Sequence, residues 1–220
     1  MGGSFQDDDR EEAMRELFEL YKDENEGRDG VDAHLDIDGY SIPFELKTTS
    51  NGSVTTVRDF GPDHIKKWKH KHWLIGFFIG GREYYHYGSP SMMADWIEEK
   101  ENYITPDFML AELTAENLSL SDMYEVMEEK AKYTYQDAVS LQKRQYKKVK
   151  YIELQDVDNG YSPQRMLEIL KDRAKYLVER GSTLNNPHIP KKYFNGWEEI
   201  TENHGKRLRE MVQGYLDENS

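Results

Sequence analysis

The sequence contains no cysteine and no long apolar run, and both absences narrow what the protein can be. Without cysteine there is no disulfide, no thiolate metal site and no cysteine nucleophile, and such a composition favours a cytoplasmic (intracellular) protein. No apolar stretch approaches the roughly 18 residues of a membrane span, so we expect no membrane partner. The N-terminal stretch "MGGSFQDDDREEAM" lacks the basic start and apolar centre of a signal peptide.

Basic residues are in the minority, but they are clustered. The 220-residue chain has 29 Lys and Arg against 42 Asp and Glu, which gives a net charge of −13. A protein that binds nucleic acid through its whole surface is therefore excluded, because phosphate binding needs a basic footprint. Three basic islands interrupt the acidic chain, at 64–73, 142–151 and 187–193. Since a local positive face can coexist with an acidic exterior, nucleic acid stays a candidate partner.

Hydrophobic periodicity predicts a mixed α/β (α+β) fold. Asp38-Gly39, between two segments of alternating polarity, predicts a hairpin with strands at 31–37 and 40–49. The other predicted elements are helices at 9–24, 63–71 and 203–216, helical structure in the region 121–150, a helix that opens at Ser162-Pro163 and ends at Gly181, a short strand at 54–57, and strands at 72–80 and 82–88. The simplest division is a single domain over residues 1–220 with a helical insertion at about 90–180.

The hairpin has one apolar and one polar face. A two-residue turn places Ala33 opposite Phe44 and Asp32 opposite Glu45, and opposed residues share a face. The apolar face consists of Ala33, Leu35, Ile37, Tyr40, Ile42, Phe44 and Leu46. The polar face consists of Asp32, His34, Asp36, Ser41, Pro43, Glu45 and Lys47.

Asp32, Glu45 and Lys47 allow two interpretations. Two opposed carboxylates repel each other in a plain sheet, and a divalent cation between them removes the repulsion. Mg²⁺ prefers carboxylates and phosphate oxygens, and it can lower the pKa of a bound water, while Lys47 would offset developing charge. In the other interpretation this is a polar sheet face on which Lys47 neutralises Glu45. The Glu-x-Lys spacing alone does not decide between them.

Segments in order along the chain resemble a known family. The segments are "GRDGVDA" (27–33), "FELK" (44–47), "FGPDHIKKWKHKHWLIGFF" (60–78) and "NNPHIPKKY" (185–193). Together they resemble the PD-(D/E)xK nuclease core, most closely the PvuII-type restriction endonucleases. The resemblance covers roughly residues 27–88 and 185–205, under half of the chain. It implies a restriction-endonuclease-like core with a mixed sheet flanked by helices.

The resemblance also implies an activity, namely Mg²⁺-dependent hydrolysis of double-stranded DNA at a short palindromic site by a homodimer. It implies a prokaryotic or viral source. Asp32 and Glu45 would bind the metal, and Lys47 would position water or stabilise the transition state. Asp29 matches an acidic position of the family and would support the metal.

DNA contacts follow from the same resemblance. Asn185 and Asn186 match the family's Asn-Asn-Pro segment, which enters the major groove, and an Asn amide suits adenine edges. The family's central histidine run is replaced by "VRD" (57–59), where Arg58 suits guanine and Asp59 a cytosine amine. His188, Lys191 and Lys192 are the remaining expected DNA contacts. Val31 replaces the proline of the family name.

One segment widens the possible substrates. The stretch 53–73 is also similar to the BisI-type group, which requires 5-methylcytosine in its site, so methylated DNA is a candidate substrate. Two other functions stay open, a structure-specific repair or junction nuclease and a non-catalytic DNA-binding protein. Zinc binding by His70 and His72 is disfavoured, because no further ligand lies near them in the sequence.

Three other features allow a simple structural explanation. Glu12, Glu16 and Glu19 are expected to be surface charges of the first helix, although a first-helix acid completes the metal site in some related nucleases. The island at 142–151 is either a solvated helix face or a phosphate contact assisted by Tyr146 and Tyr151. The aromatic stretch 73–87 is expected to form core.

Overall fold

A four-stranded mixed sheet organises one of the two compact units into which the chain divides. The computed structural model describes residues 3–23 and 30–219. Unit 1 consists of Met1–Asn102 with Leu184–Ser220 and holds the sheet, and unit 2 consists of Tyr103–Thr183. The mixed α/β (α+β) class expected from the sequence is confirmed at this level. The specific restriction-endonuclease-like core stays a prediction.

The strands of the sheet begin and end within two residues of the predicted ones. They are β1 (Ala33–Ile37), β2 (Tyr40–Thr49), β4 (His72–Ile79) and β5 (Arg82–Gly88), and their order is β1-β2-β4-β5. β2 and β4 are parallel, whereas the other neighbours are antiparallel. A parallel pair needs a crossover connection, and the helix α2 (Pro62–Trp68) lies within it.

The hairpin between β1 and β2 has the predicted register. Ala33 pairs with Phe44, and Ile37 pairs with Tyr40. The turn residues Asp38 and Gly39 have φ angles of 50° and 83°, the left-handed values that a two-residue hairpin turn of this kind requires. The expected apolar face is buried, except for Tyr40 beside the turn, which is 70% exposed.

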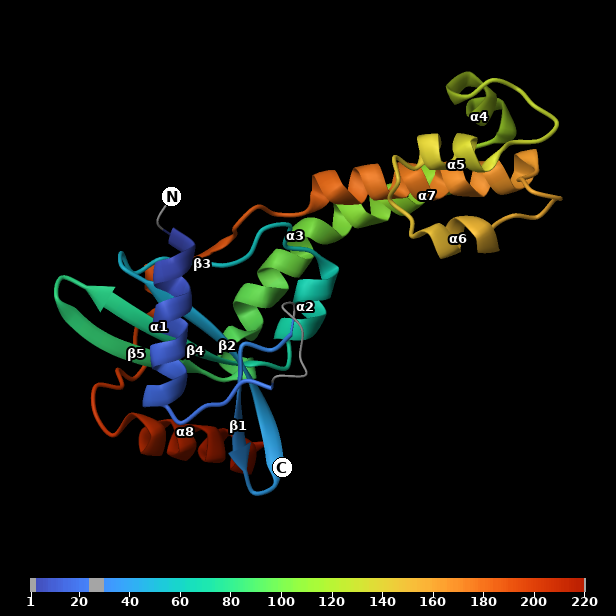
Figure 1. Ribbon diagram of the computed structural model, residues 1–220. Helices are drawn as coiled ribbons and strands as arrows, with labels where there is room; N and C mark the ends of the chain where they lie inside the picture. The colour runs from blue at the N-terminus through green and yellow to red at the C-terminus, as the bar shows by residue number, and fades with distance from the viewer. Residues whose placement is uncertain (1–2, 24–29, 220) are drawn as a thin grey trace. The chain divides into compact units, whose positions relative to one another are not determined.

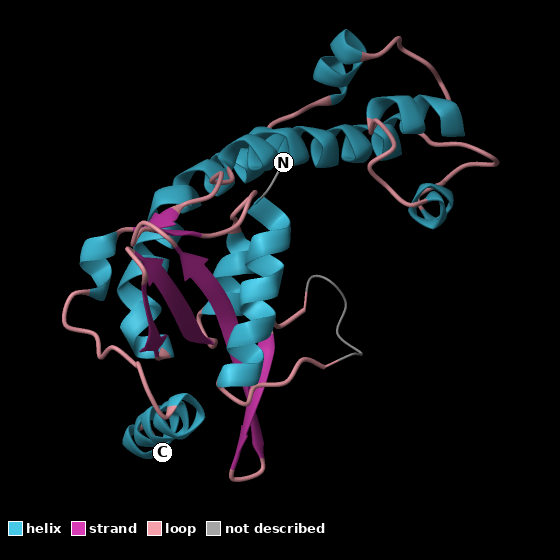
Figure 2. Cartoon of the chain, turned by 60° about the vertical axis from the view of Figure 1, so that its left-hand side comes forward, coloured by secondary structure: helices cyan, strands magenta, loops and turns pink. Residues whose placement is uncertain are grey.

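Helices cover both faces of the sheet in unit 1 (Figures 1 and 2). One face packs on α1 (Gly3–Leu17) and α8 (His204–Glu218), through Met14 of α1, Phe18 directly after it, and Leu208 and Val212 of α8. On the other face Trp73 of β4 packs against Trp68 of α2, with ring centroids 5.0 Å apart, and Trp96 of α3 (Pro90–Glu116) joins them. The expectation that the aromatic stretch 73–87 forms core is therefore confirmed for Trp73, Phe77, Tyr85 and Tyr87.

The first helix ends earlier than predicted. Apolar periodicity indicated residues 9–24, but α1 ends at Leu17 and Glu19 adopts a left-handed φ of 57°. The reason is a competing pairing, since Tyr21 forms an isolated antiparallel bridge with His34 at the edge of β1. Its N–H donates to the His34 carbonyl at 3.0 Å, and the His34 N–H donates back at 2.7 Å.

A second, two-stranded sheet joins segments that are far apart in the sequence. The strand predicted at 54–57 is present as β3 (Val54–Thr55), and it pairs with β6 (His188–Ile189). β6 lies in the "NNPHIPKKY" segment and is followed by a short 3₁₀ helix, η1 (Lys191–Phe194). This sheet therefore brings the two segments expected to read DNA side by side.

Unit 2 is helical. It contains the later part of α3 with α4 (Leu120–Val126), α5 (Tyr135–Leu141), α6 (Lys148–Glu153) and α7 (Pro163–Ser182). The helical structure predicted for the region 121–150 is confirmed in part, as three short helices separated by connections. Two capping boxes open new helices there, Ser119 with Asp122 and Thr134 with Asp137.

The cap of α7 agrees with the sequence. Ser162 accepts a hydrogen bond from the Arg165 N–H, and Pro163 occupies the first turn. The helix ends at Ser182, one residue beyond the predicted end, so Gly181 lies inside its last turn. None of the described helices has both the length and the apolar composition needed to cross a membrane.

Candidate active site

Glu45 lies buried in β2 between two lysines. Its side chain is 5% exposed, and its two carboxylate oxygens have different partners. Oε1 lies 2.8 Å from Nζ of Lys47, and Oε2 lies 2.7 Å from Nζ of Lys71. Burial alone favours the neutral acid, but the two ammonium groups outweigh it and lower the pKa of Glu45. Glu45 is therefore a fixed carboxylate.

Lys71 is a member of this site that the sequence did not indicate. It follows the turn after α2 and directly precedes β4, which is the parallel neighbour of β2. Its side chain is 7% exposed, and the carboxylate of Glu45 compensates its buried positive charge. A signal was present, because Lys71 stands in a basic island just before an apolar strand. Nothing in the sequence, however, showed that this lysine turns inward while Lys66 and Lys67 stay exposed.

Asp32 and Lys47 meet beside Glu45, as the hairpin register predicted. Oδ2 of Asp32 accepts a hydrogen bond from the Leu46 N–H at 3.0 Å and lies 3.5 Å from Nζ of Lys47. Lys47 also donates to the Leu46 carbonyl at 2.7 Å. Burial opposes its positive charge, but Glu45, Asp32 and Glu11 outweigh burial and raise the pKa of Lys47. The lysine therefore stays an ammonium that touches both carboxylates.

The first-helix acid of this site is Glu11. The sequence had offered Glu12, Glu16 and Glu19, all three of which are exposed. Glu11 is half-buried, and burial, assisted by the negative charges of Asp32 and Glu45, raises its pKa to about 7 even though Lys47 acts in the opposite direction. It is thus a third carboxyl group beside Lys47. Its raised pKa follows mainly from burial.

The donor set suits a hard divalent cation. Carboxylate oxygens of Glu11, Asp32 and Glu45 are the ligands that Mg²⁺ prefers. Among the described side chains, those of residues 9–23 and 30–219, no three His, Asp or Glu residues are gathered as metal ligands, and the lysines pair with Glu45 and Asp32. A cation would nonetheless add positive charge beside Glu11, whose pKa is raised first by burial and then by its acidic neighbours, so these residues fit one. Asp29 lies outside the described residues.

A polar groove of about 310 Å³ borders this cluster. Glu11 and Lys47 form the part of the groove that belongs to the charged cluster, and Thr55 and Thr56 form the part beside β3. Hydroxyl groups dominate the wall between them, from Thr48, Thr49, Ser50 and Ser53. The groove therefore connects the charged cluster with the small β3/β6 sheet.

The segments expected to read DNA are held together by backbone hydrogen bonds. The Asn186 N–H donates to the Val57 carbonyl at 3.0 Å, and the Thr56 N–H donates to the Pro187 carbonyl at 3.3 Å. The side chains of Arg58, Asp59 and Asn185 are exposed beside these contacts. Asn186 and Asp59 both adopt a left-handed φ of 51°, a backbone state that Asn and Asp tolerate better than other side chains.

The basic residues that follow extend this surface. His188, Lys191 and Lys192 are exposed, and Nδ1 of His188 lies 3.3 Å from the Thr55 hydroxyl. The aliphatic part of Lys191 lies over Gly52, whose φ is +90°, where a Cβ would come within 3.0 Å of it. A side chain at Gly52 would therefore displace Lys191.

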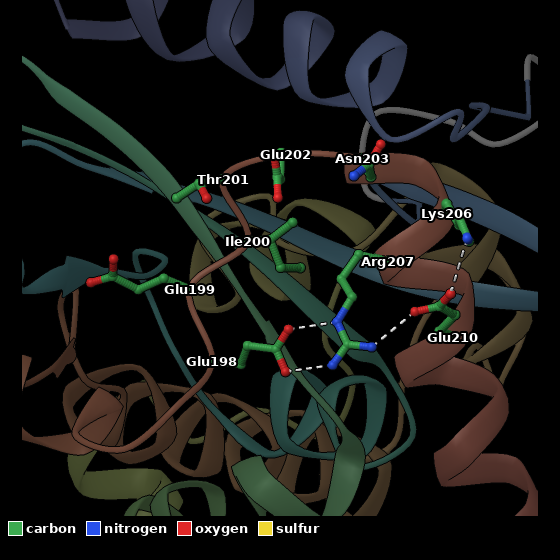
Figure 3. Close-up of a pocket in the computed structure, with 9 residues that line it drawn as sticks. All are labelled: Glu198, Glu199, Ile200, Thr201, Glu202, Asn203, Lys206, Arg207 and Glu210. Carbon is green, nitrogen blue, oxygen red and sulfur yellow. Dashed lines mark hydrogen bonds and ion pairs between the residues drawn. The ribbon is translucent and has the colours of Figure 1, made fainter.

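Another cavity of unit 1, about 300 Å³, lies at the start of α8 (Figure 3). Four acidic and two basic side chains line it, and its closest ion pairs join Arg207 to two of the acids. Both carboxylate oxygens of Glu198 pair with Arg207, at 2.5 and 2.6 Å, and Glu210 lies 2.9 Å from the same guanidinium. This arrangement fixes α8 against the preceding loop, and it offers no acid–lysine combination like that around Glu45.

Two other predicted features have structural roles. His72 is buried and its Nδ1 lies 2.7 Å from the Tyr87 hydroxyl, so it belongs to the core. Tyr151 is 2% exposed and Tyr146 bonds Asp172, so neither tyrosine offers the exposed ring that phosphate contacts at 142–151 were expected to use.

Comparison of the chain with protein-family models gives no match, and neither does comparison with curated proteins.

Proposed function

We propose that this protein is a Mg²⁺-dependent endonuclease that hydrolyses double-stranded DNA at a short, specific site. The observation that carries the proposal is the meeting of Asp32, Glu45 and Glu11 around the ammonium of Lys47. Two acidic side chains in contact with a buried cation, and a third with a raised pKa, are what hydrolysis of a phosphodiester needs. The groove also borders β3, which pairs with β6, and this small sheet carries the segments expected to contact DNA bases.

Each residue has a distinct task in this proposal. Asp32, Glu45 and Glu11 would hold Mg²⁺, which supplies Lewis acidity by lowering the pKa of water and offsetting charge on phosphate. Lys47 stays protonated, so it orients the attacking water and stabilises the charge that develops at phosphorus. Lys71 neutralises the oxygen of Glu45 that faces away from Lys47.

Specificity would come from the exposed side chains beside the groove. Arg58 suits a guanine edge, Asp59 suits a cytosine amine, and Asn185 suits adenine. Lys191 and Lys192 would position the phosphate backbone. Because each chain has one such site, a cut through both strands would require two copies, and a homodimer on a palindrome provides them.

A cleavage assay on plasmid DNA tests the proposal. One preparation of plasmid is unmethylated and the other is methylated at cytosines, and both are incubated with Mg²⁺ and the wild-type protein. We expect discrete fragments from at least one of them. Asp32→Asn keeps the acceptor for the Leu46 N–H but removes a charge, and we expect it to slow cleavage by at least about 100-fold.

Matched controls separate chemistry from folding. Asp36→Asn changes an exposed acid of the same hairpin and should leave the rate unchanged. Glu11→Gln should slow cleavage strongly, whereas Glu12→Gln, one residue away, should not. Cutting of branched but not linear DNA would favour a structure-specific nuclease. Duplex binding without any cutting would leave the acid–lysine cluster as a structural feature of a DNA-binding protein and would overturn the proposal.

A further inference from the structure

The basic island of unit 2 is built differently from a solvated helix face. Residues 138–152 contain five basic side chains and no acidic one, in a chain whose net charge is −13. They are not a continuous helix, because α5 ends at Leu141 and α6 begins at Lys148. Lys143 and Arg144 lie in the connection, both with left-handed φ angles of 50° and 62°.

In this segment the burial of a side chain depends on its charge. Gln142 and Tyr151 are buried and Tyr146 is half-buried, whereas all five basic residues are exposed. The basic residues are Lys143, Arg144, Lys147, Lys148 and Lys150. The large uncharged side chains thus anchor the segment to the rest of unit 2, and the cations remain accessible to water or to a partner.

The fastening contacts are specific. Nε2 of Gln142 donates to the Ile169 carbonyl of α7 at 2.7 Å and to the Tyr146 hydroxyl at 3.0 Å. The Tyr146 hydroxyl in turn donates to Asp172. Because the backbone is held at these points, little conformational freedom is left to lose when a partner binds.

Most of these cations have no counter-charge within the described part of the chain. Only Lys150 forms an ion pair there, 3.5 Å from Asp172, and its Nζ also lies over the Tyr146 ring. Elsewhere in unit 2 the chain does neutralise lysines, for example Lys130 with Asp137 and Lys175 with Glu112. Four exposed charges of one sign on one short segment therefore repel each other unless an anion lies against them.

We infer that Lys143, Arg144, Lys147 and Lys148 form a second DNA-binding surface, which contacts the phosphate backbone of duplex DNA without reading its sequence. The inference rests on the proposed function for its choice of partner, and it assigns a role to unit 2. Backbone contacts of this kind raise affinity and are strongly weakened by salt.

The chemistry of the segment favours duplex over single-stranded DNA. Single strands are bound through exposed aromatic rings on which bases stack, whereas Tyr151 is buried and the half-buried ring of Tyr146 lies under the Lys150 ammonium. A duplex offers regularly spaced phosphates and no free base faces, which matches cations without rings. Val149 and Ile152 are the exposed apolar residues nearby, at 63% and 51%, so an anionic lipid surface is the partner against which the inference is tested.

The test measures DNA binding in EDTA, so that no cleavage occurs. A labelled duplex of about 30 base pairs is titrated at several salt concentrations between about 50 and 200 mM. The variant K143Q/R144Q/K147Q/K148Q is compared with wild type and with K132Q/K171Q/K206Q/R82Q, which removes the same charges elsewhere. We expect the first variant to reduce the slope of log K against log salt by about 2 to 4 and to bind about 10-fold or more weakly. The second should stay near wild type.

Two half-variants, K143Q/R144Q and K147Q/K148Q, guard against a folding defect, and each should remove part of the slope. Equal effects of both quadruple variants, or none from the first, would overturn the inference. So would unchanged duplex binding together with a loss of binding to vesicles containing phosphatidylserine. The reduced slope in a protein that binds but does not cut DNA would support the inference while the proposed nuclease function fails.

Discussion

The two units treat buried charge in opposite ways. Unit 1 buries Glu45 and Lys71 together with two histidines, His72 and His86, whereas the polar side chains that are buried in unit 2 are the uncharged Gln142 and Ser182. Both units bury aromatic residues freely, so the difference does not follow from a shortage of apolar side chains in unit 1. We attribute the difference to function, because only unit 1 contains the proposed active site.

Burial of an ion pair is weak support for stability. Taking two charges out of water costs several kcal/mol each in real proteins, and an apolar pair of similar size often folds as well or better. A chain that keeps Glu45, Lys47 and Lys71 together therefore retains them at some cost, and the proposed chemistry is the reason we assign. In unit 2 none of the fully buried side chains is charged, and the exposed cations of 142–151 are available to a partner.

The largest expected effect on stability is that of Lys71→Met. The substitution keeps most of the side-chain volume but leaves Oε2 of Glu45 buried without a cation, which we expect to lower the free energy of unfolding by about 3 kcal/mol. Lys69→Met is the matched control, because Lys69 is half exposed and pairs with Glu101 at the surface. It should cost less than about 1 kcal/mol.

Urea unfolding of both variants measures this difference. A Lys71→Met protein as stable as the Lys69→Met protein would mean that the pair with Glu45 contributes no more than a surface ion pair. The contrast between the two units would then not rest on buried charge.

The next effect concerns His72 and is revealed by pH. Burial lowers the pKa of His72 from its ordinary value of 6.5 to about 4. Between these values the unfolded chain binds a proton that the folded chain does not, so stability falls as the pH falls. Between pH 7 and pH 5 we expect His72 to account for a loss of about 2 kcal/mol.

The measurement is the unfolding free energy of wild type and His72→Gln at several pH values. The wild-type protein should lose more stability than the variant on acidification. His70→Gln is the control, because His70 is exposed and its imidazole stays in water whether or not the chain is folded. Parallel curves for wild type and His72→Gln would contradict the assigned burial effect.

Local sequence patterns were enough to predict the structure where a single interaction determines it. The Asp38-Gly39 turn determines the hairpin register, and the register places Asp32 and Lys47 beside Glu45. The Ser162-Pro163 start of α7 is equally local, since one side chain satisfies one N–H group. Where two local signals compete, as at Tyr21, periodicity alone was misleading because pairing with the sheet edge ended the helix.

The rest of the site depends on contacts between distant segments. Glu11 approaches Glu45 from α1, and Lys71 approaches it from the turn after α2. The residues next to each of them in the sequence do not show that its side chain turns toward Glu45. The β3/β6 pairing likewise spans more than half of the chain. In unit 2 the capping box of Thr134 and Asp137 is a local signal, and it divides the region 121–150 that was predicted to be helical.

The smallest effect tests how unit 2 satisfies polar atoms without charge. The Tyr161 hydroxyl donates to the Tyr151 carbonyl at 2.6 Å, whereas the Tyr151 hydroxyl is buried and has no hydrogen-bond partner among the described residues. Tyr161→Phe should therefore cost about 1 kcal/mol, and Tyr151→Phe should be neutral or slightly stabilising. Urea unfolding at neutral pH compares the two. Equal losses would show that the Tyr151 hydroxyl is bonded after all, through a water or another residue, and that unit 2 pays for polar burial much as unit 1 does.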